Sequence, residues 1–366
     1  MREEKISIFQ TVAIYILVSI VPVVRYFPII MTGSAGKAAW LAAILSILPN
    51  ILLVFVLNAL MNNIKSKDGR KVEALTDVFD AVYGRVIGSI IAIIYLLWTI
   101  VFASIELRLF GERLISTTYT YSPIVFFVIS MLVLVFFVAR GKISSLGRFA
   151  EIFLELFVII IVFVLLTASS NFNFANFWPV TTYDAKGIGI GILKGTDIFN
   201  MFTFAMFFGD KIKDKENIKK TGIFAAIITG IIGLIGIIIT LGTFGEDLLP
   251  TLSQPFFMAL KVINLFGVLE RIEAVFITFW VVADFVLITY NVIVAINICK
   301  QKFKMTKRKI AVTPILFIIF ILSTIIANNY FALQVIFVNY VANIVLILGL
   351  IVPIVTFLVA KARSLL

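Results

Sequence analysis

The sequence predicts an all-α polytopic membrane protein with ten transmembrane helices in two halves of five. Hydrophobic residues make up 61% of the 366 residues and charged residues only 14%, a composition far more apolar than that of a soluble protein. The apolar residues form long runs separated by short polar connections, and each run is long enough to cross a bilayer as a helix. These observations favour a single transmembrane domain over residues 1–366.

Ten apolar segments follow one another along the chain. A helix rises about 1.5 Å per residue, so about 20 residues cross the hydrocarbon of a bilayer. We expect the spans roughly at 6–31, 38–62, 85–113, 123–139, 149–168, 187–209, 221–242, 271–299, 309–327 and 333–360.

Basic residues concentrate in alternate connections, above all at 65–71, 211–220 and 300–309. Because positively charged loops remain in the cytoplasm, this asymmetry predicts that both termini are cytoplasmic. A net charge of +11 is also compatible with binding to nucleic acid. The basic residues form short clusters between apolar runs rather than one polar face, so we expect a lipid bilayer and no nucleic acid as partner.

The residues that usually carry catalysis are scarce. The chain has one cysteine, Cys299, and no histidine, so imidazole ligands and histidine proton relays are absent from the sequence. No HExxH, GxSxG, P-loop, CxxC or EF-hand signature occurs. We therefore expect neither an enzyme nor a bound cofactor or metal.

The first span, 6–31, contains Pro22, Pro28 and Arg25 among apolar residues. A proline frees backbone carbonyls, and broken backbone at membrane depth occurs where protein or a water-filled cavity meets it. We expect a broken helix, with its first half ending near Val21, at a binding site. The alternative is a kinked helix whose Arg25 reaches the outer interface.

Two amphipathic stretches suggest an inverted repeat. The stretch 72–85 precedes the third span on the inside, and 254–267 precedes the eighth span on the outside. The segments 6–168 and 187–360 would then be two copies in opposite orientation. The sixth span should be broken like the first, after Gly195, although close packing of its glycines against a neighbouring helix is the alternative.

Several motifs together resemble a known family. They are the opening ISIFQ, the prolines of the first span, GKISSLGRFAEI, NFWPV followed by GIGIGILKG, and FGVLERIEAVFITFW. In this order and spacing they resemble the endospore germination permease family, the B subunits of the germinant receptors of spore-forming bacteria. The similarity covers essentially the whole chain. One departure is Val21-Pro22-Val23, where relatives often have small residues or glycine.

The resemblance implies the fold, partners and location of the protein. The family belongs to the amino acid–polyamine–organocation superfamily, which implies a LeuT-like five-plus-five inverted repeat. Its members are thought to bind a small nutrient, commonly an amino acid, and to act with an A subunit and a C-subunit lipoprotein in the spore inner membrane. A nutrient sensor is thus one expected function. The alternative is a secondary transporter that moves an amino acid or amine with a coupled ion.

Candidate ligand-binding residues follow from helical spacing and from the superfamily's architecture, in which the first, third, sixth and eighth spans surround the central site. Third-span residues spaced at 95, 98, 99, 102 and 106 share one face, and Asp284 lies near mid-membrane in the eighth span. The expected site residues are Ser19, Val21, Pro22, Arg25, Tyr95, Trp98, Thr99, Phe102, Glu106, Gly195, Thr196, Asp197, Phe199, Asn200, Asp284, Thr289 and Tyr290.

The two expected breaks also predict a class of ligand. A helical half starting after Gly195 would direct its N-terminal N–H groups toward a ligand carboxylate. The first-span half ending near Val21 would present free carbonyls to an ammonium group. Together they predict a site for a zwitterion, and the bulky Val21 favours a small or slender one. The charged side chains could instead form a mutually neutralised structural network.

Overall fold

The computed structural model describes residues 5–65, 69, 71–117, 119, 121–167, 172–262, 272–305, 308–327 and 329–366. Side chains are described in these ranges except at 117, 161–167, 197–199, 262, 272–275 and 308. Within them, the regular secondary structure is helical apart from two isolated bridges. Six described helices are long and apolar enough to span a bilayer, and a pair bent by 120° at residues 141–142 would make a seventh. The prediction of an all-α chain with several membrane-length helices is confirmed.

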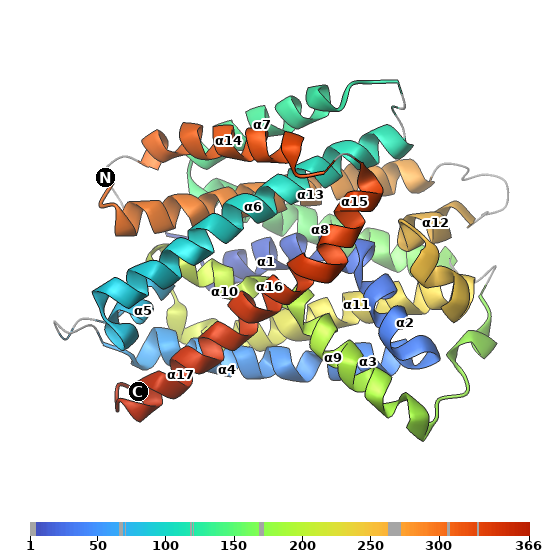
Figure 1. Cartoon of the computed structure of the whole chain (residues 1–366), viewed down its shortest axis with the longest axis horizontal. Coiled ribbons are helices and arrows are strands. Elements are labelled where there is room, and N and C mark those ends of the chain that lie inside the picture. Colours follow the sequence, from blue (N-terminus) through green and yellow to red (C-terminus); the bar gives the residue numbers. More distant parts are fainter. Residues whose placement is uncertain are drawn as a thin grey trace.

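Each apolar segment of the first half coincides with one or two helices (Figure 1). The described helices are α1 (Ile8–Arg25), α2 (Phe27–Ala35), the 3₁₀ turn η1 (Gly36–Ala38), α3 (Ala39–Leu45), α4 (Ile47–Asn63), α5 (Leu75–Tyr83), α6 (Arg85–Thr117), α7 (Ile124–Arg140) and α8 (Ile143–Thr167). α5 confirms the amphipathic stretch at 72–85, because Val78, Phe79 and Val82 on one of its faces are buried.

The second half is divided in the same way. Its described elements are η3 (Phe174–Phe177), η4 (Thr182–Asp184), α9 (Ala185–Phe199), α10 (Met201–Ala205), η5 (Met206–Lys211), η6 (Lys215–Asn217), α11 (Ile218–Leu248), η7 (Leu249–Thr251), α12 (Pro255–Val262), α13 (Ile272–Lys302), α14 (Arg308–Ile325), α15 (Tyr330–Ile336), η8 (Phe337–Val341), α16 (Ala342–Leu346), η9 (Ile347–Ile351) and α17 (Val352–Ala362). The elements η8 and η9 are π-helical turns that interrupt the last span.

The first span is broken, but not at the predicted place. Pro22 lies inside α1, and the helix continues to Arg25 because the N–H of Tyr26 donates to the Pro22 carbonyl at 2.9 Å. The interruption falls at Tyr26, and Pro28 lies in the first turn of α2, where its missing N–H removes no helical bond. The prediction that the first half ends near Val21 is therefore wrong by about one turn.

The sixth span is broken at Asn200 rather than after Gly195. α9 runs through Gly195 to Phe199, and the following α10 has only five residues before the 3₁₀ turn η5. A Cβ at Gly195 would overlap the terminal methyl of Met31 and lie 3.1 Å from the Phe27 ring, so this glycine lets α9 pack close to α2. The sequence predicts a helix that starts after Gly195 and binds a ligand carboxylate at its N-terminus. This prediction is wrong, because α9 continues through Gly195.

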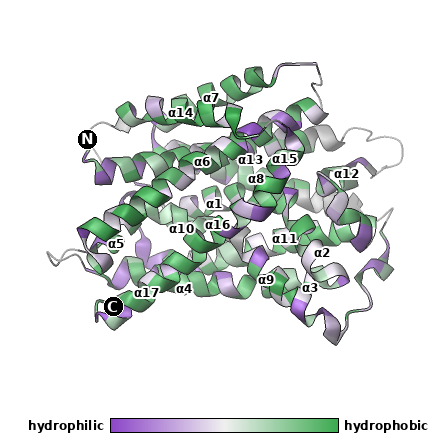
Figure 2. Ribbon diagram, in the orientation of Figure 1, coloured by the Kyte–Doolittle hydropathy of each residue, from purple (hydrophilic) through white to green (hydrophobic). Residues whose placement is uncertain are grey.

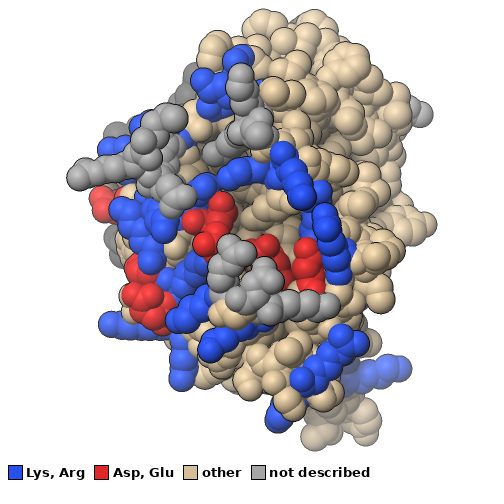
Figure 3. Space-filling model, turned by 90° about the vertical axis from the view of Figure 1, so that its left-hand side faces the viewer, with Lys and Arg blue, Asp and Glu red and all other residues tan. Residues whose placement is uncertain are grey.

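The basic loops gather at one end of the molecule, together with both termini (Figures 1 and 3). The N–H of Ile6 donates to the Lys211 carbonyl at 2.8 Å. Lys302 pairs with Asp80 at 2.5 Å, and Arg363 donates to the Val82 carbonyl at 2.6 Å. Figure 3 shows lysines and arginines around this face, with acidic residues between them. The tertiary structure thus brings the predicted inner loops together.

The helices run roughly between this basic end and the opposite end, where α12 lies (Figure 1). Hydrophobic residues cover most of their length, and most hydrophilic residues gather at the two ends (Figure 2). α1 is almost entirely buried between α8, α11 and α13, while α6 packs along α13. The charged residues of these central helices therefore face protein rather than lipid.

Candidate functional site

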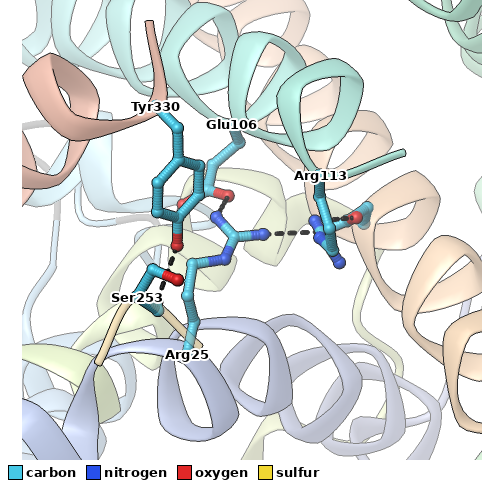
Figure 4. Close-up of polar contacts among 6 residues, drawn as sticks. Arg25, Glu106, Arg113, Ser253 and Tyr330 are labelled. Carbon is cyan, nitrogen blue, oxygen red and sulfur yellow. Dashed lines mark hydrogen bonds and ion pairs between the residues drawn. The ribbon is translucent and has the colours of Figure 1, made fainter. Parts of the chain in front are cut away.

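Four charged side chains meet in the buried centre of the molecule (Figure 4). Arg25 Nη1 lies 2.9 Å from Glu106 Oε2, and Arg25 Nη2 lies 3.3 Å from Asp284 Oδ1. Arg113 Nη2 lies 2.5 Å from Asp284 Oδ2. All four side chains are at most 3% exposed. We call these four residues the central ion network.

Three helices build the network. Arg25 is the last residue of α1, directly before the break, and Asp284 lies in α13. Glu106 and Arg113 lie two turns apart on α6, so they share a face. The sequence predicted Arg25, Glu106 and Asp284 as site residues but not Arg113, although its spacing of seven from Glu106 was a usable signal.

Trp280 supports the arginines from one side. It lies one turn before Asp284 on α13, and the Arg113 guanidinium carbon is 4.1 Å from its ring centroid. The corresponding distance from Arg25 is 5.8 Å. Cation–π contact of this kind stabilises a guanidinium that is out of reach of water. Trp280 was missed from the sequence, where it was one aromatic residue among many.

The two carboxylates are paired to different extents. Two arginines and two carboxylates leave the network with no formal net charge, which lowers the high cost of burying ions. Both oxygens of Asp284 face guanidinium nitrogens. Only one oxygen of Glu106 does, and among the described residues its Oε1 has no hydrogen-bond partner. Among the described residues, Glu106 is therefore the less fully paired of the two carboxylates.

Aromatic residues close the space around Arg25. The Tyr330 hydroxyl, which Figure 4 shows beside Arg25, donates to the Ser253 carbonyl at 2.8 Å just before α12. The Tyr26 ring, at the break of the first span, stacks on Phe337 with centroids 4.0 Å apart. These contacts join the first span, the loop before α12 and the start of the last span.

A small apolar cavity lies next to the central ion network, about one turn away along both α1 and α6. Pro22 precedes Arg25 by three residues, and Phe102 precedes Glu106 by four. The free volume is about 10 Å³, room for about one water molecule. The lining residues are Pro22, Phe102, Met201, Phe337, Val341, Ala342 and Val345. Of these, only Pro22 and Phe102 were predicted from the sequence.

Two predicted site tyrosines bond to interrupted backbone. The Tyr95 hydroxyl donates to the Leu348 carbonyl in the π-helical turn η9. The Tyr290 hydroxyl donates to the Met201 carbonyl, next to the break of the sixth span, at 2.6 Å. Both residues lie at the centre, as expected, and they satisfy carbonyls that irregular helices leave without a partner.

Two predicted threonines bond within their own helices. The Thr99 hydroxyl donates to the Leu96 carbonyl at 2.9 Å, and the Thr196 hydroxyl donates to the Leu193 carbonyl at 2.6 Å. Such i−3 bonds satisfy a buried hydroxyl locally and leave it less available to a ligand.

The other predicted residues differ in their surroundings. Ser19, Val21, Trp98, Asn200 and Thr289 are all buried. Among the described residues, neither side-chain amide atom of Asn200 has a hydrogen-bond partner. The Thr289 hydroxyl has none either among these residues. The side chains of Asp197 and Phe199 lie outside the described part of the structure.

The chain is similar in sequence to known spore germination proteins. The profile of a family described as spore germination protein matches residues 5–332. Spore germination protein KB of Bacillus subtilis (strain 168) is 22% identical over 335 residues, covering 90% of this chain and 87% of that protein. The putative spore germination protein YfkT of the same strain is 22% identical over 278 residues, covering 76% and 75%.

The fold also has a counterpart among solved structures. The crystal structure of MhsT in complex with L-phenylalanine matches with a TM-score of 0.65 over 99% of both chains, at 11% sequence identity. This similarity supports the LeuT-like fold expected from the sequence. Since the family profile covers most of the chain, the chain belongs to the spore germination protein family, whose resemblance was visible in the sequence motifs.

Proposed function

We propose that this protein is the nutrient-recognising B subunit of a germinant receptor, and that it binds a small amino acid beside the central ion network. Occupancy biases the equilibrium between two arrangements of the broken helices, and partner subunits detect the change. The observation that carries the proposal is the half-paired carboxylate of Glu106, buried at the break of the first span.

The family relationship supports a role in germination, and the central geometry supports a ligand that carries an ammonium group. A buried carboxylate oxygen without a partner favours a cation strongly, because desolvation leaves it no water to bind. An ammonium group placed on Glu106 Oε1 adds that partner without requiring the Arg25 pair to break. The fold similarity to a protein solved with L-phenylalanine is consistent with an amino acid in the centre.

The proposed arrangement in the membrane has ten spans in two inverted halves. Ten predicted apolar segments coincide with helical elements, and the amphipathic helices α5 and α12 lie at opposite ends of the molecule (Figure 1). Positively charged loops favour the cytoplasmic side for the basic end and for both termini. In this proposal the protein resides in the spore inner membrane with an A subunit and a C-subunit lipoprotein.

Binding and uptake by the full chain in proteoliposomes test the proposal against the transporter alternative. We expect radiolabelled amino acids to bind without accumulating in the lumen. Accumulation that depends on an ion gradient would favour the secondary transporter instead. If no amino acid binds, the proposed class of ligand is wrong.

A pair of matched variants tests the role of Glu106. Glu106→Gln keeps the side-chain volume and removes the charge, so we expect roughly a tenfold or greater loss of affinity, because a hydrogen bond to a charged group contributes about 1.5–3 kcal/mol. Glu112→Gln is the control, because Glu112 lies on the same helix and its carboxylate pairs at 2.8 Å with Arg108, which is not a member of the central ion network. Wild-type affinity in a well-folded Glu106→Gln protein would remove Glu106 from the site.

A further inference from the structure

The last span contributes a residue to the centre that no sequence pattern indicated. Phe337 is 3% exposed and begins the π-helical turn η8. Its ring stacks on Tyr26 at 4.0 Å and lies 6.5 Å from the Phe102 ring, both measured between centroids. It therefore bridges the break of the first span and the face of α6 that carries Phe102.

The ring of Phe337 also takes up space in the cavity next to the central ion network. Every residue that lines this cavity is apolar, and its free volume of about 10 Å³ is too small for an amino acid side chain. Of the two residues at the predicted first break, Pro22 lines the cavity, whereas Val21 is not among its lining residues. Phe337 is thus one of the side chains that keep this cavity small.

We propose that Phe337 selects the ligand by the size of its side chain, and that the preferred ligand is an amino acid with a compact apolar side chain. This inference rests on the proposed function, since it needs the ammonium group to bind at Glu106. With its ammonium group at Glu106, a ligand directs its side chain toward Phe102, one turn along α6, and hence toward Phe337. Growth of that side chain then requires the Phe337 ring to move.

The π-helical turn gives Phe337 a means of moving. A π turn holds one more residue than the same turn of an α-helix, and such turns often occur at functional sites. η8 is followed by α16 and by a second π turn, η9. A change from π to α geometry would shift the register of η8 and so displace Phe337 without breaking the span.

The test is a binding panel on the full chain in lipid nanodiscs, with glycine, L-alanine, L-valine, L-leucine and L-phenylalanine as probes. In Phe337→Ala, we expect the affinity ratio of L-leucine to L-alanine to rise by at least roughly ten- to two-hundred-fold, because a single methylene of fit in a pocket already changes binding by about this factor and leucine is the larger ligand by more than one methylene. Phe337→Leu, which disturbs packing less, should give a smaller change in the same direction.

Two controls separate the cavity from other effects. Phe331→Ala removes the same side chain from the same span, but Phe331 is 72% exposed. Tyr340→Ala removes an exposed ring (63%) from the same π turn, and Tyr340 is not among the residues that line the cavity. Neither should change the affinity ratio.

An unchanged ratio in a Phe337→Ala protein that still binds would overturn this inference and leave the proposed function standing. A change of equal size in Tyr340→Ala would also overturn it, because the π turn rather than the ring would then set the preference. Failure of the wild-type protein to bind any of the five probes would instead overturn the proposed function, and this inference with it.

Discussion

Asp284 and Glu106 are both fully buried carboxylates, yet their surroundings suit them to different roles. Asp284 holds two arginines from two helices, through Arg25 on one oxygen and Arg113 on the other. Glu106 holds only Arg25 and keeps one oxygen without a partner among the described residues. Asp284 therefore joins α1 and α6 to α13, whereas Glu106 joins only α6 to α1.

The two acids should consequently differ in their effect on stability. Removing one partner of a buried ion pair costs about 3–5 kcal/mol, because the other charge remains buried. We expect Asp284→Asn to lower the free energy of unfolding by about this amount and Glu106→Gln to lower it less, because Arg25 then still faces Asp284. Thermal unfolding of the purified variants measures both. A Glu106→Gln protein that melts below Asp284→Asn would reverse the assignment.

Irregular helices meet one another at the centre of the fold. The break of the sixth span at Asn200 packs against the π turn η9 of the last span, where Gly349 approaches Asn200 closely. The Thr203 hydroxyl donates to the Gly349 carbonyl at 2.6 Å, and the Tyr95 hydroxyl reaches the carbonyl beside it. Side chains from the third and sixth spans thus support the irregular backbone of the last one.

This contact predicts that the glycine is needed for packing. A Cβ on Gly349 would collide with the Cβ of Asn200, so Gly349→Ala should force the two spans apart and cost about 1–3 kcal/mol of stability. Gly236→Ala in α11 is the matched control, because a Cβ there would meet nothing within 4 Å. We expect the melting temperature of Gly349→Ala to lie below that of Gly236→Ala. Equal melting temperatures would show that the sixth and last spans can separate at Gly349 without loss of stability.

The whole molecule has a strongly basic end and an opposite end with fewer lysines and arginines. The basic end holds the start of α1, the loops after α4 and η5, the end of α13 and the C-terminus, joined by contacts such as Lys302 with Asp80. The opposite end carries α12 (Figure 1). Once the side of the membrane that the basic end faces is known, the orientation of every span follows.

Cysteine labelling tests that orientation. In a Cys299→Ser background, cysteines replacing the exposed Lys71, Lys213 and Lys304 should react only with reagent applied from the cytoplasmic side. A cysteine replacing Lys186, which is exposed near the opposite end, should react only from outside. Outside labelling at Lys213 with inside labelling at Lys71 would contradict the fold, in which both loops lie at one end.

Much of this protein could be predicted from the sequence because a bilayer restricts what a chain can do. Hydrocarbon requires long apolar helices, so the segments were recognisable from composition and length, and loop charge predicted which of them would share an end. The cost of burying an ion also identified Arg25, Glu106 and Asp284 as residues of the centre before their contacts were known.

Only the tertiary structure decided where the helices break and what completes the centre. α1 continues past Pro22 because Tyr26 donates to the Pro22 carbonyl, and Gly195 serves packing because Met31 of α2 lies against it. Arg113 became the fourth charge only because α6 and α13 pack side by side. Phe337 is one apolar residue in an apolar span, so its place in the cavity depends on contacts between distant segments that no local pattern encodes.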